Sequence, residues 1–386
     1  MSYELRPEHP LTTACPYFPP EEQVRLQAEL LDILNGKLSM GRHVGDFEKE
    51  FAAYCGASSG IAMPNCSAAL EVALIALSVK AGDEVLVPVE TFIATGMVVH
   101  LVSARPAFTE ISPETFSMDF EDAWARVTER TRGAIVVHFG GLISPAFPAF
   151  AARMQASGRF VIEDAAHAPG AELNGKRAGS LADAACFSFF PTKIMTTGEG
   201  GMLVTSRVDV ALMARSLQNR GLDMTSEGEL YQHPGRNNHF SEIAAAMGLS
   251  QLRCLPEFLE RRRYIAALYD EAFRENDRIQ PIRAFGGSRS SYWRYPVLLQ
   301  PELDRKALRD ALKADGITID WPYDPPLHLQ PVFRQLLKTR PGMLPRSEAL
   351  LSRHVCLPMH ARLRDVDAAY VIERVHHHVQ RLSGAH

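Results

Sequence analysis

The stretch AACFSFFPTKIMTTGEGGMLV, residues 184–204, places a lysine and a glycine-rich turn between two apolar runs. These runs predict strands at Ala185–Ser188 and Gly201–Thr205. Further short apolar runs precede them at Gly60–Met63, Glu84–Val89, Arg105–Glu110, Gly133–Val137 and Arg159–Glu163. Helical patterns alternate with the runs at Ala68–Ser78, Thr91–Leu101, Phe120–Val127 and Pro145–Ala156. This alternation predicts an α/β fold with a mostly parallel sheet between helices.

The pattern changes in the second half of the chain. A long helical stretch, Ser241–Glu275, contains Pro256, which is expected to break or kink it. Beyond it, strands are predicted at Ser291–Leu299 and Thr318–Trp321, and helices at Asp304–Ala314 and Asp365–Leu382. We therefore expect two domains: an N-terminal segment with a large α/β domain over residues 1–255, and a small α+β domain over residues 256–386.

Composition excludes some classes of function. The chain has 41 Lys and Arg against 45 Asp and Glu, a formal charge of −4, with no basic or acidic block. Nucleic-acid-binding proteins normally carry a basic face, so that class is disfavoured. The six cysteines are scattered without a CxxC pair, as reduced thiols would be. With no visible secretory signal and no apolar run of membrane-spanning length, we expect a soluble cytoplasmic protein.

Lys193 stands between the aromatic run 187–190 and the glycines at 198–201, whereas the other lysines lie in polar turns or on amphipathic helices. Burial lowers the pKa of an amine and makes it a better nucleophile. A lysine that holds a carbonyl cofactor as a Schiff base needs such an environment. The alternative is a partly exposed lysine on a loop, and this segment alone leaves both readings open.

Asp164 ends the apolar stretch RFVIED, residues 159–164, and precedes Lys193 by enough residues for one crossover to a neighbouring strand. In parallel sheets, ligands collect beyond the carboxyl ends of the strands. Pyridoxal phosphate (PLP) needs a carboxylate at its ring nitrogen, because the protonated ring is its electron sink. Asp164 is placed for that role, although a strand-end aspartate also commonly caps the following turn.

A phosphate site is predicted where strand Gly60–Met63 runs into a helix, because free N–H groups and the helix dipole favour an anion there. The residues at this turn are Asn65, Cys66 and Ser67. Ser67 is equally suited to be an ordinary N-cap. Ser188, close to Lys193 in the chain, offers a second hydroxyl.

Phe92 follows strand Glu84–Val89 and is suited to stack on an aromatic cofactor, or simply to fill the core. Each of these signals is modest by itself. Together, a nucleophilic lysine, a ring-nitrogen carboxylate, a phosphate turn and a stacking ring at strand ends predict a PLP site.

Several longer segments resemble the DegT-type family of PLP-dependent sugar aminotransferases. They are VIEDAAHAPGAELNGKRAGS, FSFFPTKIMTTGEGGML, VPVETFIAT, GRNNHFSEIAAAMGLSQL, PLHLQPVF and CLPMH. The resemblance runs in order from about Gly41 to Met359, and the lysine and EDAAH segments are its most specific parts. It implies a fold type I aminotransferase that works as a homodimer with shared active sites.

The resemblance assigns roles by position. Lys193 matches the Schiff-base lysine, Asp164 the partner of the ring nitrogen, and His167 a Gln or His beside the ring. Ser67 and Ser188 match hydroxyl positions on the phosphate side, and Phe92 matches the stacking residue. Asn237 matches an asparagine that reaches the phosphate of the neighbouring subunit.

The sequence departs from the family pattern at three places. Asn65-Cys66-Ser67 replaces a pattern that usually ends in Gly-Thr, and Gly140-Gly141-Leu142-Ile143 replaces a Gly-Gln-Pro type of turn. His239 stands where arginine is common. The first change leaves the detail of phosphate binding open. The three changes together leave the identity of the substrate less certain than the cofactor chemistry.

The resemblance implies that an amino group moves from glutamate or glutamine to a nucleotide-linked keto-sugar in two ping-pong half-reactions. Displaced from the cofactor, Lys193 would act as general base and acid. Alternatives are a cyclitol-ketone aminotransferase, a PLP-dependent sugar dehydratase and a non-catalytic PLP-binding sensor. Dehydrating relatives replace the lysine by histidine, so Lys193 favours amination. A nicotinamide-dependent enzyme is disfavoured because no GxGxxG follows the first strand.

Candidate substrate contacts are His328, in the family-like LHLQP segment, and Arg220 and Arg236, which flank the stretch leading to Asn237. Each arginine is also suited to a solvated surface position. The triplet at 376–378 is all histidine, but adjacent side chains on a helix diverge and would not converge on one metal ion. No metal site is therefore expected.

Overall fold

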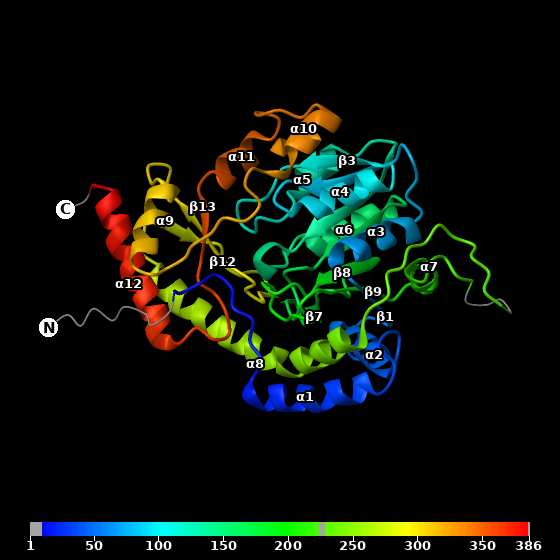
Figure 1. The fold of residues 1–386 in the computed structure, drawn as a ribbon. Helices are drawn as coiled ribbons and strands as arrows, with labels where there is room; N and C mark the ends of the chain where they lie inside the picture. The colour runs from blue at the N-terminus through cyan, green and yellow to red at the C-terminus, as the bar shows by residue number, and fades with distance from the viewer. Residues whose placement is uncertain (1–9, 224–227, 385–386) are drawn as a thin grey trace.

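The computed structural model describes residues 10–223 and 228–384 (Figure 1). Its centre is a seven-stranded sheet with the order β1-β9-β8-β5-β4-β2-β3. Neighbouring strands are parallel except where β9 pairs antiparallel with β1 and β8. The strands are β1 (Ser59–Met63), β2 (Glu84–Pro88), β3 (Arg105–Thr109), β4 (Thr131–Val137), β5 (Phe160–Asp164), β8 (Ala184–Ser188) and β9 (Gly201–Thr205). All seven predicted strands are present, which confirms the mostly parallel α/β fold.

Successive residues of the central strands alternate between two hydrophobic cores. In β4, Ala134 and Val136 belong to the first core and Ile135 to the second. The first core packs against α2 (Arg42–Cys55), α6 (Phe147–Ala156) and α8 (Glu242–Ala272). The second packs against α3 (Cys66–Ala76), α4 (Ile93–Leu101) and α7 (Val208–Gln218). Burial on both faces explains why the strands are continuous apolar runs in the sequence.

The C-terminal part is built around a smaller antiparallel sheet, β10 (Ile279–Pro281), β12 (Tyr295–Leu299) and β13 (His354–Leu357). Helices α9 (Arg305–Ala314) and α12 (Asp365–Leu382) contribute to its core, and both were predicted. Leu11 joins this core and pairs with Ile317, so the start of the described chain lies against the C-terminal part. The division of the chain at residue 255 stays a prediction.

The remaining elements complete the outline. They are α1 (Pro20–Leu34), α5 (Phe120–Ala125), α10 (Pro331–Leu337), α11 (Pro345–Leu351), the short 3-10 turns at Phe139–Gly141 and Leu327–Leu329, and the small sheet of β6 (Glu172–Leu173), β7 (Lys176–Arg177) and β11 (Ser288–Arg289). No helix within residues 10–223 and 228–384 is both long and apolar enough to cross a membrane.

Two sequence predictions in this half are wrong, the second in part. Thr318–Trp321 is not a strand, because Ile317 pairs with Leu11 on one side and Asp320 with Cys356 on the other, which leaves only isolated bridges. Of the break or kink expected at Pro256, the break does not occur, since α8 continues through this residue. Buried Leu255 and Phe258 on either side hold the helix in place and compensate for the hydrogen bond that proline cannot make.

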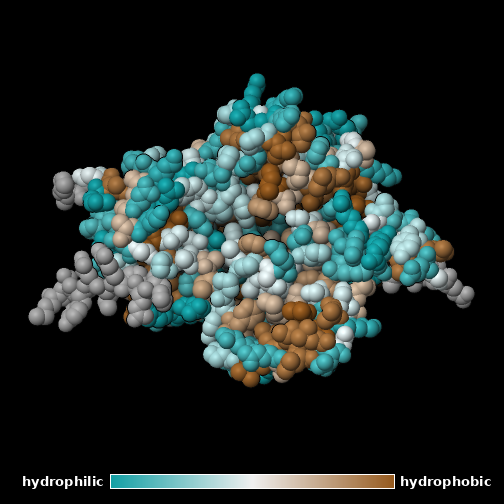
Figure 2. Space-filling model, viewed as in Figure 1, coloured by the Kyte–Doolittle hydropathy of each residue, from teal (hydrophilic) through white to brown (hydrophobic). Residues whose placement is uncertain are grey.

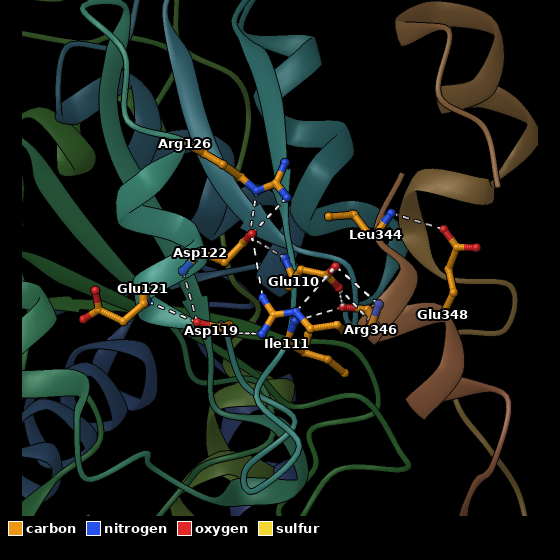
Figure 3. Close-up of polar contacts among 10 residues, drawn as sticks. Glu110, Ile111, Asp119, Glu121, Asp122, Arg126, Leu344, Arg346 and Glu348 are labelled. Atoms are coloured by element: carbon orange, nitrogen blue, oxygen red, sulfur yellow. Dashed lines mark hydrogen bonds and ion pairs between the residues drawn. The ribbon is translucent and has the colours of Figure 1, made fainter. Parts of the chain in front are cut away.

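The segment that contains α10 and α11 is fixed to the large sheet by ionic contacts. Figure 3 shows Arg346 of α11 pointing into an acidic group that follows β3. Its Nη1 lies 2.8 Å from Asp119 Oδ2, and Glu110 Oε2 accepts a 2.8 Å hydrogen bond from the backbone N–H of Ser347. These contacts position the chain between residues 321 and 351 over the carboxyl ends of the strands.

Candidate active site

A cavity of about 530 Å³ opens at the carboxyl ends of the central strands. Its lining combines residues from the ends of β1, β4, β5 and β8 with a segment of the C-terminal part. The residues predicted from the sequence that line it are Asn65, Cys66, Ser67, Phe92, Asp164, His167, Ser188 and Lys193. The structure therefore brings together in one place residues that are spread over more than a hundred positions of the sequence.

Lys193 faces this cavity, and protein surrounds it on its other sides. Burial lowers the pKa of its amine to about 8, although Asp164 and Cys66 act in the opposite direction. Its Nζ lies 4.5 Å from the centroid of the Trp293 ring. An amine with this pKa is partly neutral near pH 8, and only a neutral amine can attack a carbonyl carbon. The alternative of a solvated loop lysine is disfavoured by this environment.

Asp164, the last residue of β5, is almost fully buried. Its Oδ2 accepts a 2.8 Å hydrogen bond from the Thr95 hydroxyl, and its Oδ1 accepts one from the Ala166 N–H at 3.2 Å. Burial nevertheless raises the pKa of this carboxyl above its usual value. A buried carboxylate in this state is stabilised by a cationic partner, such as a protonated ring nitrogen. Asp164 also caps the turn through Ala166, as its second interpretation expected, and its role at the ring nitrogen stays a prediction.

The predicted phosphate turn lies at the start of α3. Asn65, not Ser67, is its N-cap: the Asn65 side chain accepts a 2.8 Å hydrogen bond from the Ala68 N–H. Ser67 lies inside the first turn, where its hydroxyl borders the cavity. Burial raises the pKa of the Cys66 thiol well above 9.0, so this side chain adds no negative charge beside an anion.

Gly201 allows the close approach of β9 to this turn. A Cβ atom at residue 201 would collide with the backbone of Asn65 and Cys66. Gly201, the first residue of β9, is thus required by packing against the phosphate turn, in addition to any role beside Lys193.

Aromatic rings occupy two sides of the cavity. Phe92 is 57% exposed and lines the cavity, so the alternative that it fills the core is wrong. His167 is buried and lies flat against Trp293, with ring centroids 3.6 Å apart and an interplanar angle of 9°. Burial, together with the positive charge of Lys193, lowers the pKa of His167 well below 6.5, so its imidazole is neutral.

Four lining residues come from the C-terminal part and were missed in the sequence: Trp293, Arg294, Pro322 and Tyr323. The segment SYWRYPVLL was interpreted as one strand, but β12 begins only at Tyr295. Before β12, the backbone N–H of Trp293 donates to the Gly140 carbonyl, and this hydrogen bond turns the chain across the cavity. A tryptophan beside an arginine at the entry to a strand was the available signal.

Four predicted site residues lie outside the cavity of their own chain. Arg236 pairs with Glu71 at 2.8 Å, and the Arg220 guanidinium donates to Asn219 Oδ1 at 3.1 Å. His328 is buried, and its Nε2 lies 3.0 Å from Glu348 Oε1. Asn237 is exposed on the segment before α8. Their roles toward phosphate or substrate stay predictions.

The histidine triplet on α12 diverges as expected for adjacent helical residues. His376 Nε2 lies 3.1 Å from the Ala272 carbonyl, and His378 Nε2 lies 2.6 Å from Asp315 Oδ2.

Glu90 is a fully buried carboxyl directly before Thr91 and Phe92 of the cavity wall. Both of its oxygens lack a hydrogen-bond partner among the described residues, and the nearest basic atom, His354 Nε2, is 3.6 Å from Oε1. Burial raises the pKa of Glu90 well above 4.5, with Asp324 acting in the same direction, and burial lowers the pKa of His354 to about 4. Both shifts favour the neutral form of the side chain.

Replacing Glu90 by glutamine is expected to stabilise the fold at high pH. The pKa of Glu90 is higher in the folded protein than in the unfolded chain. At a pH between these two values, the unfolded chain loses the proton that folded Glu90 keeps. The free energy of unfolding of the wild type therefore falls as pH rises through this range. Glu90→Gln removes that loss. Urea denaturation should show little difference between the two proteins at pH 5 and an advantage for the variant of about 1–3 kcal/mol at pH 8. A variant equally destabilised at both pH values would instead indicate a charged Glu90–His354 pair.

Comparisons with known proteins agree with this geometry. Residues 20–376 match the model of the DegT/DnrJ/EryC1/StrS aminotransferase family. A GDP-perosamine synthase of Caulobacter vibrioides is 36% identical over 86% of this chain and 89% of its own length. A UDP-N-acetyl-3-dehydro-alpha-D-glucosamine 3-aminotransferase of Acidithiobacillus ferrooxidans is 34% identical over 86% and 87%.

Among solved structures, the aminotransferase TlmJ from Streptoalloteichus hindustanus superposes with a TM-score of 0.89 at 29% identity, covering 97% of this chain and all of the other. The described cavity has the buried amine, carboxylate and phosphate turn that PLP requires, and PLP is the cofactor of this protein. It is a PLP-dependent aminotransferase, and the chain belongs to the DegT/DnrJ/EryC1/StrS aminotransferase family.

Proposed function

We propose that this aminotransferase transfers an amino group from glutamate or glutamine to a keto-sugar linked to a nucleotide. The observation that carries the proposal is the buried amine of Lys193, beside Asp164, in a cavity at the strand ends. The named relatives act on GDP- and UDP-linked sugars, which supports the substrate class.

The residues of the cavity suit PLP in kind and in position. Lys193 would hold it covalently through Nζ, and Asp164 would meet its ring nitrogen. The first turn of α3 with Ser67, and Ser188 across the cavity, would bind the phosphate. When bound, PLP supplies an electron sink that stabilises negative charge at the substrate carbon.

Lys193 would also move the protons of the reaction. Once the amino donor replaces it, its Nζ is free and, with a pKa of about 8, can take a proton from the α-carbon of the donor and return it. The Thr95 hydroxyl and the Ala166 N–H hold the Asp164 carboxylate in one orientation, which would keep its charge at the ring nitrogen of the bound cofactor. Phe92 and Tyr323 at the cavity wall would exclude water from the reacting atoms.

We further propose that two copies of the chain form the working unit in the cytoplasm. A groove of about 310 Å³ between α1 and α8 has an almost wholly apolar lining that includes Phe18, Leu26, Leu30, Ile243 and Met247. Figure 2 shows apolar side chains gathered over the lower part of the molecule, where Figure 1 places α1 and α8. Apolar surfaces of this kind mark protein interfaces.

The segment after Asn237 favours a second copy of this chain as the partner that packs on the apolar groove. Ser39 pairs with Ser241, and Glu242 N–H donates to the Leu38 carbonyl, so the segment after Asn237 runs along the edge of this face. A second chain packed on the face would therefore also lie near Asn237, the residue proposed to reach the phosphate of the partner.

The rival functions differ in substrate or in chemistry. A cyclitol-ketone aminotransferase would use the same cofactor residues on a ketone without a nucleotide. A sugar dehydratase is disfavoured because Lys193 is present. A non-catalytic sensor would hold the cofactor but would not react with glutamate.

A spectroscopic screen separates these functions. The amine form of the cofactor, prepared on the enzyme with glutamate or glutamine, would be mixed with nucleotide-linked keto-sugars, free keto-sugars and cyclitol ketones. We expect only nucleotide-linked keto-sugars to restore the visible absorption of the lysine-bound cofactor rapidly. Restoration by cyclitol ketones alone would replace the proposed substrate class, and failure of both amino donors to convert the cofactor would indicate a sensor.

A further inference from the structure

Three aromatic side chains from distant parts of the sequence form one ordered group beside Lys193. The His167 ring lies flat on Trp293, and the ring of Tyr323 is within 6° of the plane of His167. The Tyr323 hydroxyl lies 2.8 Å from His167 Nε2. We call this set the His167 group: His167, Trp293 and Tyr323.

The surroundings fix the His167 group firmly. The Trp293 indole N–H donates to the Thr192 carbonyl at 2.8 Å, which ties the group to the residue before Lys193. Tyr292, with φ 48°, and Tyr323, with φ 66°, both adopt the left-handed backbone region. Such conformations cost on the order of 1–3 kcal/mol for a residue with a side chain, and they persist where the surrounding structure requires them.

The hydrogen bond to Tyr323 decides where His167 carries its proton. Burial raises the pKa of the Tyr323 hydroxyl well above 10.0, so it keeps its proton. His167 Nε2 is its one hydrogen-bond partner among the described residues, so an accepting hydroxyl would leave its own proton unpaired. A donating hydroxyl requires Nε2 without a proton, which places the single N–H of the neutral imidazole at Nδ1.

Nδ1 is the atom that His167 has left for a ligand. It is buried and has no hydrogen-bond partner among the described residues. Buried polar groups are rarely left unpaired, and His167 lines the cavity that holds Lys193 and Asp164. PLP carries its phenolic oxygen on the ring carbon adjacent to the one that bears the aldehyde, the group that Lys193 attacks.

We infer that Tyr323 is a positioning residue: its hydroxyl, bonded to His167 Nε2, fixes the tautomer in which His167 Nδ1–H donates to the phenolic oxygen of PLP. This inference rests on the proposed function and extends it to a residue of the C-terminal part. Tyr323 makes no contact with the reacting atoms in this role and acts through His167. A donor at the phenolic oxygen stabilises negative charge there and opposes protonation of the neighbouring nitrogen of the Lys193 linkage.

Tyr323→Phe should therefore raise the pH at which the visible absorption of the holoenzyme changes, by about one unit. The charged or titratable groups that face His167 are Lys193, Arg294 and His138, and those that face Tyr323 are Asp164, Glu90, Arg294 and Asp320. None of them is altered by this substitution. The readout is an absorbance titration of the loaded enzyme, and it requires no turnover.

The matched control is Tyr269→Phe, which removes a buried hydroxyl that donates to the Pro358 carbonyl, away from the cavity. This variant should keep the wild-type absorbance titration. His167→Gln removes the tautomer choice, so Tyr323→Phe should cause no additional shift in the His167→Gln background.

The outcomes separate this inference from the proposed function. Wild-type protein without the lysine-bound absorption band would overturn the function. A normal band whose titration is unchanged in Tyr323→Phe would overturn the inference alone. An equal shift in the wild-type and His167→Gln backgrounds would overturn the step through His167, because Tyr323 would then act on the cofactor by another route.

Discussion

Lys193→Ala is expected to lose amino transfer by at least about 10⁴-fold, because one side chain supplies both the covalent attachment and the proton transfer. Steady-state assays with glutamate and the keto-sugar identified by the screen would measure this loss. The purified variant should also fail to trap the cofactor covalently on borohydride reduction, since no other amine is proposed to reach the cofactor. Cofactor bound only through Asp164 and the phosphate turn should leave on dialysis more readily than in the wild type.

Two matched variants separate nucleophilicity from charge and from general effects. Lys193→Arg keeps a cation in the cavity but provides no neutral amine near pH 8, so it should be as inactive as the alanine variant. Lys176 lies exposed on β7, and Lys176→Ala should retain wild-type activity. Substantial turnover by both Lys193 variants would overturn the assignment of this residue.

The environment of Lys193 shows what the sequence could predict. Most residues of the seven central strands are buried, on both faces of the sheet, so their apolar runs are continuous and their limits were predicted to within a few residues. Asp164 is the last residue of β5, and Lys193 comes shortly after β8 in the chain. Once the strands were identified, their ends predicted the position of the cavity.

Trp293 and Tyr323 could not be predicted in this way. They belong to irregular segments whose paths depend on contacts with distant residues, such as the Trp293 N–H bond to Gly140. Local patterns do not encode a left-handed backbone at Tyr292 or Tyr323. The same reason explains the error at residues 318–321, where the chain alternates between two pairing partners.

Asn237 poses a different problem, because no single chain contains its proposed contact. It lies exposed before α8, while the phosphate turn of its own chain is built by Asn65 and Ser67 without it. If the two chains share their sites, each site contains Lys193 of one subunit and Asn237 of the other. A substitution of Lys193 in one subunit and a substitution of Asn237 in the other subunit should then affect the same site. Asn237→Asp suits this purpose, since it keeps the size of an exposed side chain and places a carboxylate against the phosphate.

Heterodimers purified through two different tags would test the shared site. The first heterodimer combines one Lys193→Ala subunit with one Asn237→Asp subunit. At one of its two sites, an intact Lys193 meets the intact Asn237 of the other chain. This dimer should therefore regain about half of the wild-type activity, although each homodimer is inactive. A dimer of wild type with the double variant should be inactive, because its only intact Lys193 faces the altered residue 237. Sites complete within one chain would reverse both results: the first heterodimer would be dead and the second half active. The two dimers carry the same substitutions in the same number, so differences in folding or expression cannot produce this reversal.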